Sequence, residues 1–255
     1  MPLFVGTAGW TIPRKHAQLF PAPTEDETRS HLERYASRLR GVEINSSFYR
    51  PHRRATWERW AAATPEGFHF AVKAPKTVTH DALLVNADAA LREFFEAVSA
   101  LGGKLGPVLF QLPPKLAFDD AIAEMFFTTV RGAHTGAVVV EPRHATWFSD
   151  EAERLLRRFK VARAAADPPK GSNAAAEPGG WRGLRYWRLH GSPRTYYSNY
   201  EDEWLLALVK RMQTDARSIA EKETWVIFDN TTLGHAAANA VWLDEALGQD
   251  GSGLR

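Results

Sequence analysis

The sequence predicts an α/β protein built as a single (β/α)8 barrel of the TIM type. Eight short β-branched or apolar runs recur along the 255 residues, and seven of the eight gaps after them have mainly helical patterns. Strands that alternate with helices pair in parallel, and eight such units in about 250 residues have the size of one closed barrel. Several runs end in a charged or amide side chain. Because barrels of this type place their sites at the carboxyl ends of the strands, function is sought there.

The expected strands are short and end at turn residues. They lie at residues 3–8, 42–46, 68–73, 107–112, 136–141, 161–166, 184–190 and 224–229. Pro113 and Pro114 end the fourth strand and Pro142 ends the fifth, because proline cannot continue a central ladder.

The segments between these strands predict the helices. We expect them at residues 27–40, 54–63, 87–101, 119–131, 149–159, 200–220 and 235–247. The Pro- and Gly-rich segment 167–181 predicts a long loop that replaces or shortens the helix after strand six. Nothing splits the chain, so we expect one barrel domain over residues 1–248 and a frayed tail over 249–255.

Composition excludes several classes of protein. There is no cysteine, which excludes disulfides and cysteine-ligated metals. The N-terminus lacks a signal-peptide pattern and no apolar run is long enough for a membrane span, so we expect a cytoplasmic protein without a membrane partner. Lys and Arg number 32 against 30 Asp and Glu, a balance that disfavours a general nucleic-acid binder. No pattern in the sequence specifies an oligomeric state.

Alternation along the strands predicts a polar basin inside the barrel. Side chains alternate across a strand, and the bulky apolar ones must face the surrounding helices. The residues of opposite parity are then Glu43, Asn45, Lys73, Gln111, Glu141, Arg188 and His190. Buried charges are costly unless they are paired or solvated, so this set indicates a wet, ligand-binding mouth.

Glu43 and Glu141 are the candidate catalytic residues. Two carboxylates in one site can be held at different pKa values, which suits hydrolysis of a glycoside or proton transfer at carbon. The alternative is structural: each carboxylate forms an ion pair with Lys73, Arg143 or Arg188.

Cations at the same strand ends predict a site for an anion. Arg50, Lys73, Arg143 and Arg188 could hold a carboxylate or phosphate, which a guanidinium binds through two parallel hydrogen bonds. A second element, with Asn230 and Thr231, precedes the last helix, whose free N–H groups would attract phosphate. The alternative for the threonine is a simple helix cap.

Histidine, carboxylate and phenol groups at or beyond the strand ends complete the candidate ligand site. They are His80, His144, Asp167, Tyr49, Tyr196 and Tyr197. The histidines do not have the spacing of a local metal motif, so we expect hydrogen-bonded histidines, no metal and no cofactor. The tyrosines could stack on a ligand, or they could simply cover the barrel rim.

Long motifs along the chain resemble one known family. They are GTAGW (6–10), EINSSFYRP (43–51), FHFAVKAPKTVTH (68–80), LGPVLFQLPP (105–114), EPRHATWF (141–148), RLHG (188–191) and FDNTTLGHAAANA (228–240). In this order they resemble the YecE-like family, or domain of unknown function 72. The resemblance implies a single β/α barrel and supplies no reaction. The family pattern has Asn where this chain has Asp229.

Two function classes follow. The first is a protein that binds a small, polar, anionic or sugar-like molecule at the barrel mouth and acts as an acid/base hydrolase or isomerase. The second is a non-catalytic module that binds a nucleotide or nucleic-acid phosphate through Arg50, Arg53, Arg54, Lys76 and the tyrosines. Balanced total charge favours the first.

Overall fold

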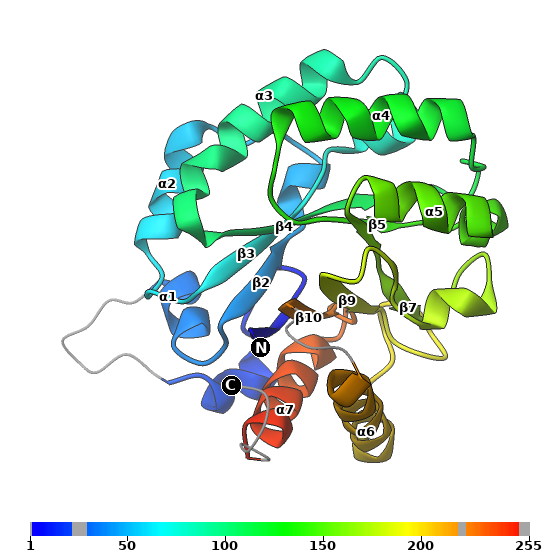
Figure 1. The fold of residues 1–255 in the computed structure, drawn as a ribbon. Helices are drawn as coiled ribbons and strands as arrows, with labels where there is room; N and C mark the ends of the chain where they lie inside the picture. Colours follow the sequence, from blue (N-terminus) through cyan, green and yellow to red (C-terminus); the bar gives the residue numbers. More distant parts are fainter. Residues whose placement is uncertain (1, 22–29, 219–222, 250–255) are drawn as a thin grey trace.

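Strands and helices alternate along most of the chain in the computed structural model, which describes residues 2–21, 30–218 and 223–249 (Figure 1). The strands are β1 Leu3–Thr7, β2 Gly41–Ile44, β3 His69–Lys73, β4 Leu105–Gln111, β5 Val138–Glu141, β6 Val161–Arg163, β7 Ala165–Asp167, β8 Gly179–Gly180, β9 Leu184–Leu189 and β10 Glu223–Phe228. The helices are α1 His31–Ala36, α2 Arg54–Ala62, α3 Asp88–Val98, α4 Asp120–Ala133, α5 Asp150–Arg158, α6 Asp202–Ser218 and α7 His235–Gln249.

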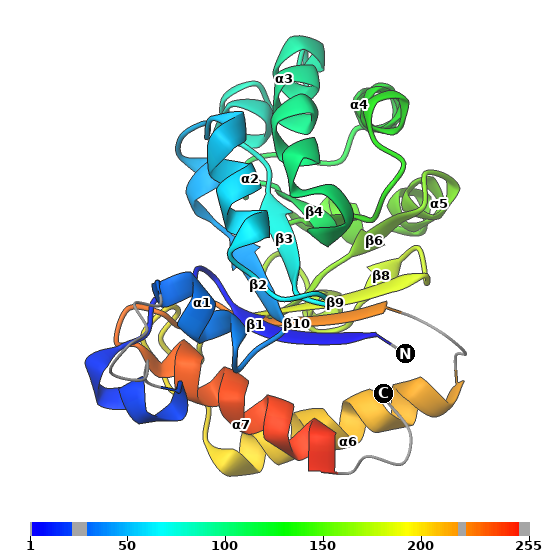
Figure 2. The same ribbon diagram turned by 90° about the vertical axis from the view of Figure 1, so that its left-hand side faces the viewer.

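The strands form two sheets that are almost entirely parallel. One has the order β1-β10-β9-β7 and the other the order β2-β3-β4-β5-β6-β8. Only the β6–β8 pair is antiparallel in the described part of the chain. Helices α6 and α7 lie below the first sheet in Figure 2, and α2 to α5 lie beyond the second. The α/β class and the parallel pairing are confirmed, whereas closure into one barrel stays a prediction.

The sixth expected strand is interrupted, which the sequence did not indicate. Ala164 separates β6, which pairs with β5, from β7, which pairs with β9. The backbone N–H of Ala164 still donates to the carbonyl of Val140, so the chain changes its partner within one residue. As expected, 167–181 contains no α-helix, only a 3-10 turn at Asn173–Ala176 and strand β8.

The first helix is shorter than expected. It begins after Ser30, whose hydroxyl accepts from the Glu33 N–H while the Glu33 carboxylate accepts from the Ser30 N–H. The part expected at 27–29 lies outside the described residues, as do positions 250–255 of the expected tail. No helix within the described ranges is long and apolar enough to cross a membrane.

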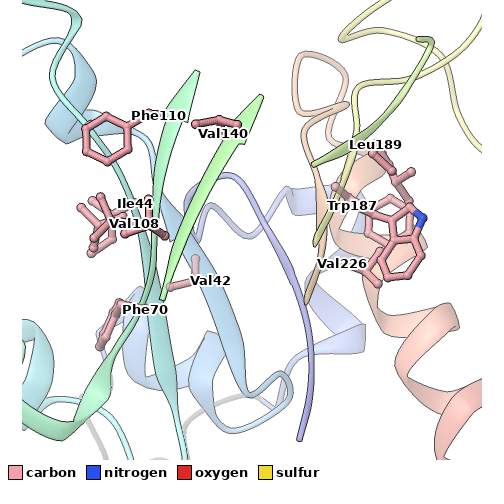
Figure 3. Close-up of a cluster of buried hydrophobic side chains, with 14 of the residues drawn as sticks. Val42, Ile44, Phe70, Val108, Phe110, Val140, Trp187, Leu189 and Val226 are labelled. Carbon is pink, nitrogen blue, oxygen red and sulfur yellow. The ribbon is translucent and has the colours of Figure 1, made fainter. Parts of the chain in front are cut away.

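The apolar side chains form two buried clusters, as the alternation predicts. The outer cluster contains Val72, Phe110, Val140, Trp187 and Val226. The inner cluster contains Ala71, Leu109, Val139, Tyr186 and Ile227, the neighbours of those residues along each strand. In Figure 3, Phe110 and Phe70 lie on one outer side of the strands, and Trp187 and Val226 lie on the opposite outer side. The inner faces are thereby left to residues of the other parity.

Candidate functional site

Charged and polar side chains follow the inner parity where the parallel strands end. Because β2, β3, β4, β5, β9 and β10 run parallel to their neighbours, their carboxyl ends lie at one edge of the sheets. The buried polar residues there are Glu43, Lys73, Gln111, Glu141, Arg188, His190 and Asp229. Six of these seven were predicted to converge.

Arg188 is the centre of this cluster and is fully buried. Its Nε and Nη2 donate to the two carboxylate oxygens of Glu43 at 3.0 and 2.7 Å. Its Nη1 donates to Glu141 at 2.6 Å and its Nη2 also to Asp229 at 3.2 Å. One guanidinium therefore holds carboxylates from β2, β5 and the end of β10 together.

Glu43 accepts hydrogen bonds from two residues of the cluster, Arg188 and Tyr186. The hydroxyl of Tyr186 donates to it at 2.8 Å, beside the two bonds from Arg188. Burial, and then the Glu43 charge, raise the pKa of Tyr186 well above its usual value. The geometry matches the structural alternative, an ion pair with Arg188, and proton transfer by Glu43 stays a prediction.

His190 bridges the other two carboxylates. Its Nδ1 lies 3.0 Å from Asp229 and its Nε2 lies 3.2 Å from Glu141. Burial acts to lower the pKa of His190, but Glu141 and the hydrogen bond to Asp229 outweigh it, and the pKa is raised. Burial likewise acts to raise the pKa of Glu141, which Arg188, His190 and Arg143 together hold well below its usual value.

Arg143 and Tyr196 extend the cluster toward solvent. The Nε and Nη2 of Arg143 donate to Glu141 at 3.2 and 3.1 Å, and its side chain remains 18% exposed. A hydrogen bond joins Arg143 to Tyr196, whose ring packs edge-on against His190. Arg143 thus has a buried side that is neutralised and an outer side that water can reach.

Lys73 differs from the other buried charges. Its Nζ lies 4.0 Å from the centroid of the Phe48 ring, and no residue that the structure describes accepts a hydrogen bond from it or lies close enough for a salt bridge. Burial, and then repulsion by Arg188, lower the pKa of Lys73 to about 8, although Glu43 and Glu141 act in the opposite direction.

His80 adds to the positive side of the site. It lies on a π-helical turn, Thr77–Asp81, just beyond β3, with its ring against Phe48. Burial lowers its pKa, and the charges of Lys73, Arg143 and Lys115 lower it further. All three cations therefore act on the same imidazole.

Several predicted ligand residues lie apart from this cluster. Tyr49 is 72% exposed and, with the exposed Arg50, lines a separate cavity of about 250 Å³ between the β2 and β3 loops and α3. Tyr197 stacks under Arg194, and the exposed Thr231 follows β10.

The side chains of three other predicted residues bond to partners outside the buried cluster. His144 caps the turn at Thr146, Asp167 accepts from the Tyr200 hydroxyl at 2.7 Å, and the Asn230 amide donates to Ser198 and Asn239.

Two further predicted residues, Asn45 and Gln111, lie at the same strand ends. The Oδ1 of Asn45 is buried without a hydrogen-bond partner. Gln111 ends β4 at the position paired with Glu141.

The predicted site residues left out three that contact the cluster or Lys73, namely Tyr186, Asp229 and Phe48. Tyr186 shares the inner parity of Arg188, and Asp229 follows the last strand directly, so both could have been found by the same alternation. Phe48 lies in the 3-10 turn Ser46–Phe48 that follows β2, where no strand periodicity indicates the direction of a side chain. Among the described residues, no group of three or more His, Cys, Asp or Glu side chains is arranged to hold a metal ion.

Comparison with known proteins identifies relatives along the whole chain. The UPF0759 protein YunF of Bacillus subtilis is 25% identical over 99% of this chain and 97% of its own length. The UPF0759 protein YecE of Escherichia coli is 31% identical over 50% of this chain and 47% of its own length.

Solved structures agree in fold. A DUF72 family protein from Enterococcus faecalis superposes with a TM-score of 0.77 at 19% identity, covering 96% of this chain and 95% of that one. One from Thermotoga maritima gives 0.75 at 24% identity, covering 97% and 100%. The family described as "Protein of unknown function DUF72" matches residues 4–254. The chain therefore belongs to the DUF72 family, which the motifs in the sequence had indicated.

Proposed function

We propose that the carboxyl-end edge of the strands is a binding site for a small anionic molecule, carried on a single closed (β/α)8 barrel. Closure is supported by two contacts between the sheets. Ala8 at the end of β1 bridges to Glu43 in β2, and β6 and β7 continue one another across Ala164. The site then lies at the mouth, where barrels bind their ligands.

The observation that carries the proposal is the distribution of charge in two layers. In the inner layer, Glu43, Glu141 and Asp229 are bound by Arg188 and His190, and Arg143 also donates to Glu141. The outer layer consists of cations. Lys73 has no anionic partner among the described residues, and Arg143 keeps an exposed side. A carboxylate or phosphate group there would accept hydrogen bonds from both cations.

His190 and Glu141 supply the proton-transfer chemistry in this proposal. Histidine can both accept and donate a proton, and at His190 the Glu141 carboxylate raises the pKa and fixes the ring from one side. Glu43 orients Arg188 and does not act on the ligand. The reaction would be an acid/base conversion of the bound anion, such as a hydrolysis or an isomerisation.

Titration with inorganic phosphate and with small carboxylates, followed by calorimetry or NMR, tests the proposal. We expect saturable binding that Arg143→Met weakens about tenfold or more, since a hydrogen bond to a charged group contributes about 1.5–3 kcal/mol. Lys76→Met, which removes an exposed lysine just beyond β3, is the matched control and should leave affinity within about twofold. Absence of saturable binding, or equal losses in the two variants, would refute the anion site.

A further inference from the structure

Lys73 is held in surroundings that favour an uncharged amine. Its side chain is buried at the end of β3, with the amine over the Phe48 ring. The nearby carboxylates are already engaged, because Glu43 accepts from Arg188 and Tyr186 and Glu141 accepts from Arg188 and Arg143. A buried ammonium without its own counter-ion is costly, and loss of the proton removes that cost.

The consequence is a nucleophile at neutral pH. With a pKa of about 8, roughly a quarter of Lys73 is uncharged at pH 7.5, compared with about 0.1% of an ordinary lysine. Desolvation and an adjacent cation are the two means by which lysines are activated toward carbonyl compounds. Lys73 has both, since its side chain is buried and Arg188 is among the charges that act on it.

We infer that Lys73 forms an imine with a small aldehyde or ketone that carries an anionic group. This inference rests on the proposed anion site, because Arg143, whose outer side is exposed, would hold the anionic group. A ligand with its carbonyl next to a carboxylate, as in a 2-oxo acid, fits both requirements.

The step balances without a further reactant. The lone pair of Nζ attacks the carbonyl carbon, a C–N bond forms, and the carbonyl π electrons move to oxygen. One amine proton passes to that oxygen and gives a carbinolamine. The hydroxyl then leaves as water with the second amine proton, and the C=N bond remains. Nothing is oxidised or reduced.

Reductive trapping in the full-length protein tests the inference. The protein is incubated with glyoxylate and cyanoborohydride at pH 7.5, and peptide mapping measures the rate at which each lysine becomes carboxymethylated. Lys76, three residues away and exposed, is the internal control. We expect Lys73 to react at least tenfold faster than Lys76, and inorganic phosphate to slow it at least fivefold. Equal rates at the two lysines would overturn the inference.

The outcomes separate this inference from the proposed function. Equal labelling together with saturable phosphate binding removes the imine and leaves the anion site. Fast labelling of Lys73 that phosphate does not slow supports the amine chemistry and removes the anion site. Lys73→Arg keeps the charge without a primary amine, so it should bind phosphate and lose the fast-labelled peptide. Because wild-type labelling is mapped by peptide, the result does not depend on the variant being folded.

Discussion

Replacing Lys73 with methionine should stabilise the protein at neutral pH. The folded state lowers the pKa of this lysine from 10.5 to about 8. Between these two values the unfolded chain binds more protons than the folded one, so the contribution of Lys73 to stability rises with pH. Below pH 8 both states carry the charge and the full cost of burying it is present. Above pH 10.5 neither state is charged and the cost vanishes.

The magnitude follows from the same two values. The gap between 10.5 and about 8, at about 1.4 kcal/mol for each unit, corresponds to roughly 3 kcal/mol at pH 7. Relaxation and water at the carboxyl-end edge of the strands screen part of this cost. Methionine has a similar length and can lie against Phe48 without a charge. We therefore expect Lys73→Met to gain about 1–3 kcal/mol at pH 7.

Urea denaturation at several pH values between 7 and 10 measures this gain. The difference between Lys73→Met and wild type should be largest at pH 7 and should shrink as the pH rises above 8. Lys76→Met, an exposed change, should stay within about 0.5 kcal/mol of wild type throughout. A variant that is less stable than wild type at pH 7, or a difference that does not change with pH, would refute the reasoning. It would show that the lysine is stabilised by an anionic partner.

Three further predictions concern the buried cluster and the backbone beneath it. Arg188→Met should lose about 3–5 kcal/mol in urea denaturation because it leaves the buried Glu43 without an ion-pair partner and removes one partner each from Glu141 and Asp229. A loss below about 1 kcal/mol would contradict its central position. The pKa of His190 is raised in the folded state, so its contribution to stability is fully present below pH 6.5 and is lost as the pH rises through that pKa. The difference in Tm between wild type and His190→Gln should therefore narrow from pH 6.5 upward. A difference that stays constant with pH would contradict the raised pKa. Gly6→Ala should lower the free energy of unfolding by about 2 kcal/mol or more, because its Cβ would collide with the carbonyl of Gly41. Gly132→Ala, on an open helix face, should raise it by about 0.5–1 kcal/mol. Equal effects of the two variants in urea denaturation would contradict this reasoning.

Strand periodicity predicted much of the site because it acts on each strand separately. Val72 and Trp187 joined the outer cluster as expected, and Lys73 and Arg188 lie on the opposite face. Parallel pairing then brings the strand ends to one edge without further information. The alternation thus predicts which side chains meet, provided that they belong to strands.

The features that the sequence did not predict depend on contacts between segments that are distant in the sequence. The change of partner at Ala164 follows from which neighbours the chain meets, and no local pattern records it. Strand β8 depends on Gly180, where φ is 67° and a Cβ would lie 2.5 Å from the Val161 carbonyl. The loop residues Tyr49 and Tyr197 were assigned to the mouth from their position after strands, but loop backbones turn their side chains elsewhere.

The two charge layers explain why one site contains both charged groups that are fully hydrogen-bonded and charged groups that keep free donors. A buried ion cluster such as that of Arg188 with Glu43 adds little net stability compared with an apolar core, because desolvation offsets the attraction. It does fix positions, since each bond that Arg188 donates constrains a strand end. Arg143 is oriented in the same way by its two hydrogen bonds to Glu141, so the position of its exposed side is fixed before a ligand binds. Lys73 carries an electrostatic cost that the nearby carboxylates relieve only in part, and such a cost is characteristic of groups retained for function.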